Sequence, residues 1–107
     1  MPMTCTRKTL VAHGTKQALA ASATYCTWLV VQASKDNVGY VYLGGTDVKN
    51  AVDNANAFVG IVLAPGAMTP AILPHGNSGL LELTSFYWDG DTNNDVITVT
   101  YMSKTKY

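Results

Sequence analysis

The sequence predicts a single all-β domain over residues 1–107, an antiparallel β-sandwich of a jelly-roll-like or β-barrel-like kind. Short runs rich in β-branched and aromatic residues alternate with clusters of Gly, Pro, Asn and Asp, a spacing typical of these folds. Apolar residues make up 48% of the chain and charged residues only 13%, so the chain has enough apolar surface to fold. A length of 107 residues suits one domain rather than two.

The first part of the chain is expected to contain an arm and three strands. Residues 1–8 are a possible N-terminal arm. A strand over 6–12 ends at the turn-forming pair His13-Gly14, and a weak, alanine-rich strand over 17–21 could return beside it. The uncharged run 25–33 (YCTWLVVQA) predicts the central strand, covered on both faces and with Trp28 in the core.

The central strand is expected to continue into a hairpin. Residues 34–37 are a polar turn, and the alternating run 38–43 (VGYVYL) that follows predicts the second strand, which Gly44-Gly45 ends. The segment 46–58 departs from this strand pattern. Behind a Thr46-Asp47 cap it has apolar residues at helical spacing, and it also has three Asn residues, so it predicts a short helix near 47–57 or an irregular loop.

The last part of the chain is expected to be β-rich as well. A strand over 59–63 ends at residues 64–67, where Pro followed by Gly predicts a type II turn. The run 68–73 is extended, and its proline together with Pro74 places it at a sheet edge, because proline donates no ladder hydrogen bond. Strands over 80–88 and 96–102 are expected to form a final hairpin through the acidic loop 89–95.

The charges of the chain argue against several kinds of partner. Seven Lys and Arg residues balance seven Asp and Glu residues, and the basic residues are scattered, so no basic stripe is present to bind nucleic acid. The longest weakly polar stretch, 18–31, is shorter than the roughly 20 residues of a membrane span. A net charge near zero gives little repulsion between copies, which favours assembly into something larger.

The N-terminal residues and the cysteines indicate the compartment. No apolar segment follows Arg7-Lys8, so the start of the chain does not match a secretory signal, and we expect synthesis in the cytoplasm. Cys5 and Cys26 could pair, but thiols are usually kept reduced in that compartment, so we expect both to be free.

The candidate chemical sites all have a simpler explanation. The loop 89–95 has oxygen side chains at alternate positions, as a calcium loop begins, but Asn94 and Thr100 stand where an EF-hand needs Gly and Glu. A plain turn explains the same residues, although an irregular calcium site is an alternative. Neither histidine, His13 or His75, has a second ligand at metal spacing, and the pair His75 and Ser78 lacks the G-x-S-x-G pattern. The sequence therefore predicts no catalytic, cofactor-binding or metal site.

The aromatic residues are the best candidates for contact with a partner. Alternation along 38–43 places Tyr40 and Tyr42 on one face of the strand, and Trp88, like them, lies near polar loops. These three residues are the predicted partner-contact residues. They belong to a set of six aromatic residues that could form a platform on which a sugar stacks: Trp28, Tyr40, Tyr42, Phe86, Tyr87 and Trp88. Packing in the core is the competing explanation for the aromatic residues as a set.

Three segments together resemble a known class of proteins. They are the run Gly39-Tyr-Val-Tyr-Leu-Gly-Gly-Thr-Asp-Val48, the run Gly60-Ile-Val-Leu-Ala-Pro-Gly66, and a final strand pair with an Asp-rich tip. In this combination, over about residues 28–102, the chain resembles small virion accessory proteins of tailed bacteriophages, of the capsid decoration or cement type. It differs from the usual pattern in a longer insert at 49–58.

The resemblance implies a structural function without catalysis. It implies a subunit made in the host cytoplasm and found in the virion, where it binds and stabilises the assembled capsid through the major capsid protein or other virion proteins. It also implies a homo-oligomer, with a trimer as the favoured state. The alternative function is a carbohydrate- or receptor-binding module of a phage tail or fibre, which would use Tyr40, Tyr42 or Trp88.

Overall fold

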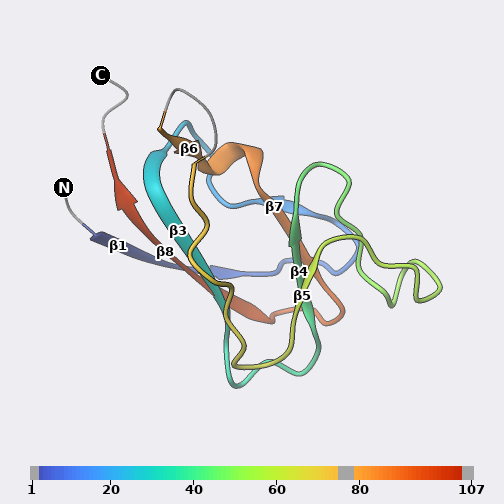
Figure 1. Ribbon diagram of the computed structural model, residues 1–107. Helices are drawn as coiled ribbons and strands as arrows, with labels where there is room; N and C mark the ends of the chain where they lie inside the picture. Colours follow the sequence, from blue (N-terminus) through green and yellow to red (C-terminus); the bar gives the residue numbers. More distant parts are fainter. Residues whose placement is uncertain (1–2, 75–78, 105–107) are drawn as a thin grey trace.

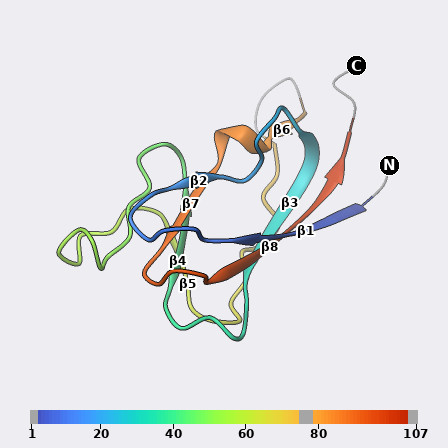
Figure 2. The same cartoon turned by 180° about the vertical axis from the view of Figure 1, so that it is seen from behind.

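The computed structural model describes residues 3–74 and 79–104, which form two antiparallel sheets of four strands around one shared core (Figure 1 and Figure 2). A single 3-10 turn, η1 (Leu83–Ser85), precedes β7. In spatial order, sheet A contains β1 (Met3–Thr9), β8 (Val96–Ser103), β3 (Tyr25–Ala33) and β6 (Leu81–Glu82). Sheet B contains, in the same way, β2 (Gln17–Ala18), β7 (Tyr87–Gly90), β4 (Val41–Gly44) and β5 (Ile61–Leu63).

The strand order is that of a jelly roll. Strands of the first half of the chain pair with strands of the second half in reverse order: β1 with β8, β2 with β7, β3 with β6, and β4 with β5. The chain is therefore one long antiparallel ribbon that turns back between β4 and β5 and is rolled into two sheets. The pairs β3–β8 and β4–β7 complete the sheets. The predicted all-β sandwich is confirmed, in its jelly-roll form.

The two predicted hairpins are wrong. β3 belongs to sheet A and β4 to sheet B, so the polar turn at 34–37 leads from one sheet to the other. Residues 89 and 90 of the predicted acidic loop belong to β7, and residues 91–95 join β7 of sheet B to β8 of sheet A. β2 pairs with β7 rather than with β1. In this ribbon most consecutive strands cross between sheets, and only β4 and β5 are both consecutive and paired.

The core lies between the sheets and takes one face of each long strand. In β3, Cys26, Leu29, Val31 and Ala33 are buried, while the other face is half-buried or exposed, so the prediction of a strand covered on both faces is wrong. Trp28 is only half-buried, because the register with β8 shifts between Cys26 and Leu29. This irregularity adds a residue to the strand and turns Trp28 out of the core.

The N-terminal segment is a strand and not a free arm. β1 pairs with β8 along its whole length, from Met3 opposite Met102 to Thr9 opposite Val96, so the predicted arm at 1–8 is wrong for residues 3–8. Residues 1 and 2 lie outside the described part. β1 is an edge strand whose side chains are at most half-buried. A strand in this position needs no large apolar face, so Thr and Cys residues suffice there.

The segment 46–58 is an irregular loop, so the predicted short helix near 47–57 is wrong. It contains consecutive turns, a β-bridge between Lys49 and Val59, and positive φ angles at Ala55 and Asn56. Asn50 is completely buried, and its side chain hydrogen-bonds to the loop itself and to the Gly90 carbonyl. Asn side chains that bind the backbone compete with helical hydrogen bonds, which explains the outcome.

Two other predictions for this half of the chain are confirmed. Residues 64–67 form the turn, with Gly66 at φ 84° and the Ala67 amide donating to the Ala64 carbonyl at 2.9 Å. The run 68–73 is extended at the edge of sheet A, with bridges from Met68 and Ile72 to β3. Both cysteines are free thiols, as expected. The predicted His75–Ser78 loop lies outside the described residues.

Asp95 ties the β3–β4 loop to the start of β8. Its carboxylate is 4% exposed and accepts hydrogen bonds from the backbone amides of Val38 at 3.0 Å and Gly39 at 2.9 Å. Beside it, the Asn37 side chain donates to the Val96 carbonyl and accepts from the Val96 amide. These contacts fix the crossing between the sheets at a point where no strand ladder is present.

Replacing Asp95 with Ala is expected to lower the free energy of unfolding by about 2–4 kcal/mol, because two backbone donors lose a charged acceptor. Asp95→Asn should cost less, since the amide keeps one oxygen. Urea denaturation measures both, with the exposed Asp36→Ala as control. Equal stability of Asp95→Ala and Asp36→Ala would contradict the anchoring role.

Candidate functional site

The structure separates the three predicted contact residues. Tyr40 is 51% exposed, whereas Tyr42 and Trp88 are each 1% exposed. Tyr40 therefore remains available to a partner. The prediction that Tyr42 and Trp88 lie at the surface of the domain is wrong, and no stacking platform of these three residues forms there.

Tyr42 is buried because the 46–58 loop folds over the outer face of sheet B. Its ring lies 5.7 Å from that of Phe58, and its hydroxyl donates a 2.8 Å hydrogen bond to Asp91. Burial, followed by the Asp91 carboxylate, raises the pKa of the Tyr42 hydroxyl to about 12. The residue thus points away from the core, as alternation predicts, but the loop covers it.

Trp88 is buried for a different reason. The register places it opposite Leu43, on the inner face of sheet B, where both residues belong to the core. Among the described residues, its indole Nε1 is the one buried side-chain nitrogen or oxygen without a hydrogen-bond partner. Trp88 therefore acts as a core residue in the isolated domain.

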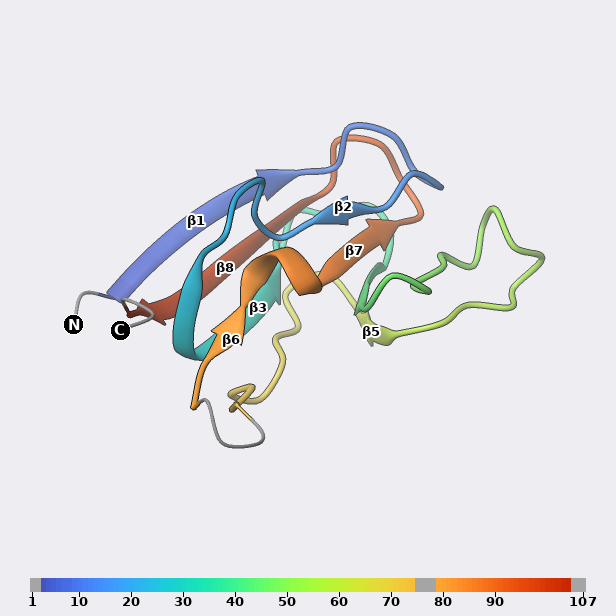
Figure 3. The ribbon, with the colours of Figure 1, turned by 90° about the horizontal axis from the view of Figure 1, so that it is seen from above.

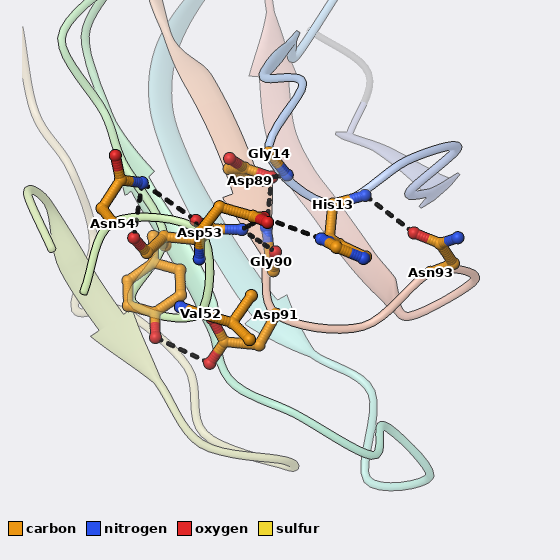
Figure 4. Close-up of polar contacts among 11 residues, drawn as sticks. His13, Gly14, Val52, Asp53, Asn54, Asp89, Gly90, Asp91 and Asn93 are labelled. Atoms are coloured by element: carbon orange, nitrogen blue, oxygen red, sulfur yellow. Dashed lines mark hydrogen bonds and ion pairs between the residues drawn. The ribbon is translucent and has the colours of Figure 1, made fainter. Parts of the chain in front are cut away.

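A network of polar contacts joins three loops at one end of sheet B (Figure 4). His13 Nδ1 lies 2.7 Å from Asp53 Oδ2, which also accepts from the Asn50 side chain at 2.6 Å. Asp89 Oδ1 accepts from the amides of Gly14 at 3.0 Å and Gly90 at 2.8 Å. The network joins the β1–β2 loop, the 46–58 loop and the end of β7 into one unit.

The charges in this network perturb one another. The hydrogen bond to Asp53 raises the pKa of His13, and the hydrogen bonds from His13 and Asn50 lower the pKa of Asp53. Burial raises the pKa of Asp89. The His13–Asp53 pair is strongest where the imidazole is protonated and the carboxylate is ionised.

The carboxylates of the 89–95 loop serve as acceptors for backbone and side-chain groups of the fold. Asp89 accepts from the Gly14 amide, and Asp91 accepts from the Tyr42 hydroxyl and the Val52 amide. Asp95 accepts from amides of the β3–β4 loop.

Within residues 3–74 and 79–104, no three His, Cys, Asp or Glu side chains are grouped so that they could hold a metal ion. In the same part of the chain, no helix has the length and apolar character needed to span a membrane.

A long segment of the chain carries no charged side chain, a feature that no sequence motif marks. No Lys, Arg, Asp or Glu lies between Asp53 and Glu82, although the chain has seven basic and seven acidic residues. This segment includes β5, the 64–67 turn and the extended run 68–73. Figure 3 shows that it runs along the side of the sandwich opposite β1. A plot of charge along the chain would have revealed it.

Exposed apolar side chains gather on this segment, around the edge strand β5. We call this surface the β5 side, and its most exposed members on and before the strand are Phe58 (49%), Val59 (40%), Ile61 (50%) and Val62 (37%). Next to it, Ile61, Leu43, Ile72 and Phe86 line an apolar recess of about 250 Å³. Met68 and Leu73 are exposed further along the same segment.

A surface of this kind favours contact with another macromolecule. Exposed edge strands are usually protected by charged residues, and exposed apolar surface can mark an interaction site. Ile61, opposite Leu43, and Val62, opposite Tyr42, lie on the two faces of β5, so the exposed apolar side chains surround this edge. The β5 side has no charged residue of its own. Its strand is three residues long, so side-chain burial rather than strand pairing would supply most of the contact.

Comparison with protein-family models, curated proteins and solved structures finds no match for this chain.

Replacing Asp53 with Asn is expected to lower the pKa of His13 toward its ordinary 6.5, because the main cause of its raised pKa is removed. In the parent protein, the His13 contribution to stability is complete below pH 6.5 and is lost as the pH rises through the raised pKa. The Asp53 contribution is present above pH 3.8 and is lost as the pH falls through its lowered pKa.

An NMR titration of the imidazole resonances measures the His13 pKa directly. Asp36→Asn, which changes an exposed carboxylate beside Lys35, is the matched control and should leave His13 unchanged. A His13 pKa of 6.5 in the parent protein would show that the pair does not form in solution.

Proposed function

We propose that this chain is a structural accessory subunit of a tailed-phage virion, of the capsid decoration type, which binds an assembled capsid through its β5 side. The observation that supports the proposal most is the exposed, uncharged apolar surface around Ile61 and Val62. Within a virion, a capsid protein would cover this surface. The proposal assigns no chemical reaction to the chain, and it includes a homo-oligomer, with a trimer as the favoured state.

The net charge and the apolar recess give further support to an assembled state. The net charge of zero gives little electrostatic repulsion between neighbouring subunits. The jelly roll is a fold of viral capsid domains, but also of lectins and cupins, so it is compatible with the proposal without deciding it. The apolar recess beside Ile61 offers a place into which a side chain of the partner could insert.

The alternative of a glycan-binding module that uses the aromatic platform has less support. Two of the three aromatic residues in that hypothesis are buried, and Tyr42 is held by Asp91 and Phe58. Loss of glycan binding on Tyr42→Ala would therefore not distinguish a lost contact with the glycan from a disturbed 46–58 loop.

The substitution Ile61→Asp is expected to weaken binding to capsids by about tenfold or more, because it places a charge in the buried centre of the contact. Co-sedimentation of the purified protein with capsids that lack it measures the affinity. Val38→Asp is the matched control, because Val38 is also β-branched and is 81% exposed, but lies outside the β5 side. Circular dichroism confirms that both variants remain folded.

Equal binding by Ile61→Asp and the parent protein would show that the capsid contact lies outside the β5 side. Absence of the chain from purified virions, measured by mass spectrometry, would overturn the whole proposal. Light scattering of the purified protein measures the oligomeric state separately.

A further inference from the structure

A second concave site lies on the outer face of sheet B, and its Lys49 pairs with Val59 at the start of the β5 side. We call it the loop groove. It has a volume of about 530 Å³, and its walls come from the β1–β2 loop, at Gly14–Lys16, and from the beginning of the 46–58 loop, at Thr46–Lys49. Its volume falls within the range of small-molecule sites, about 300–1,000 Å³.

Asp89 lines this groove, and one of its carboxylate oxygens accepts hydrogen bonds while the other has no partner among the described residues. The residue is 2% exposed, and its Oδ1 accepts from the amides of Gly14 and Gly90. Its Oδ2 has no hydrogen-bond partner within the described residues, so a nearly fully buried carboxylate keeps one unpaired oxygen at the wall of the groove. Figure 4 shows this second oxygen turned away from the contact with Gly14. Asp89 therefore offers the groove a fixed hydrogen-bond acceptor.

The residues that line the groove supply both hydrogen-bond donors and acceptors, and their positive and negative charges are equal in number. Lys16 and Lys49 are balanced by Asp47 and Asp89, so the formal charges of the lining residues cancel. Lys16 donates to the Thr46 carbonyl and so bridges the two walls. Neither Lys49 nor Asp47 takes part in an ion pair among the described residues, and both are exposed, so both can bind a ligand.

The groove has no aromatic side chain, and its exposed surface combines polar atoms with a comparable share of carbon. Val48 is its one large apolar residue, and it is 4% exposed, since it packs beneath the groove. A ligand that carries both hydroxyl and C–H groups can contact both kinds of surface, whereas an anion such as phosphate would face two carboxylates. Hydroxyl groups both donate and accept, so a ligand with several hydroxyls matches carboxylates and ammonium groups at once.

From this chemistry we infer that the loop groove binds a neutral saccharide of one or two units. Asp89 and Asp47 accept hydrogen bonds from sugar hydroxyls, and Lys49 donates to them. The inference does not rest on the proposed capsid contact: the groove and the β5 side adjoin through the Lys49–Val59 bridge but share no residue. It also differs from the aromatic platform, since none of Tyr40, Tyr42 and Trp88 lines the groove.

A titration of the isotope-labelled protein with the methyl glycosides of glucose, galactose, mannose and N-acetylglucosamine tests the inference by NMR. At least one glycoside is expected to shift the amide resonances of Gly14, Thr15 and Lys49 in a saturable way. Asp47→Asn and Lys49→Met should each weaken its binding by about tenfold, through loss of one charge-assisted hydrogen bond. Both residues are exposed, so these variants should fold normally.

Asp89→Asn gives the sharpest comparison. An Asn oxygen can still accept from Gly14 and Gly90, while its amide presents a donor where the groove had an acceptor, so saccharide binding should be lost with the fold retained. Asp36→Asn and Lys35→Met, in the distant 34–37 turn, are the matched controls and should bind like the parent.

Three results would overturn the inference. They are no shift with any of the glycosides, shifts that do not involve the groove residues, and saturable binding of inorganic phosphate in place of the glycosides. Each result is distinct from failure of capsid binding, which Ile61→Asp reports.

Discussion

The β1–β8–β3 ladder is the part of the molecule on which the other elements depend. Seven paired positions join β1 to β8, and β8 continues into the pairing with β3. By contrast, β2, β5 and β6 have two or three residues each and could not persist alone. Sheet A therefore supplies a rigid layer, and sheet B is held against it by the burial of Trp88, Leu43 and Leu63.

Because the strands of sheet B are short, side chains replace ladder hydrogen bonds at its ends. Asn50 and Asp89 connect loops to β7, and Asp95 fixes the crossing from β3 to β4. The same loops cover Tyr42 and form the walls of the loop groove. The edge of sheet B at β5 has no such cover, so Ile61 on one face of the strand and Val62 on the other stay exposed. One end of the molecule is thus polar and closed by loops, and one side is apolar and open.

The sequence predicted properties that depend on neighbouring residues. The strand character of 25–33, the turn around Gly66 and the edge position of 68–73 follow from local propensity and from proline chemistry. The sequence did not predict which strands pair, because a hairpin turn within one sheet and a connection between two sheets are built from the same types of residue. Nor did it predict the burial of Tyr42: alternation gives the face, but only the fold places the 46–58 loop over it. The loop groove joins Asp89 to residues over 70 positions away, which no local pattern reveals.

The reversed pairing of the strands also determines when the fold can be completed during translation. β1 has no partner in its sheet until β8 has left the ribosome, because β8 is its one neighbour there. The nascent chain therefore waits with an unpaired N-terminal strand, and contacts between residues far apart in sequence form slowly. The β1–β8 ladder is thus among the last to form, and until then the growing chain exposes an unpaired strand, which favours aggregation.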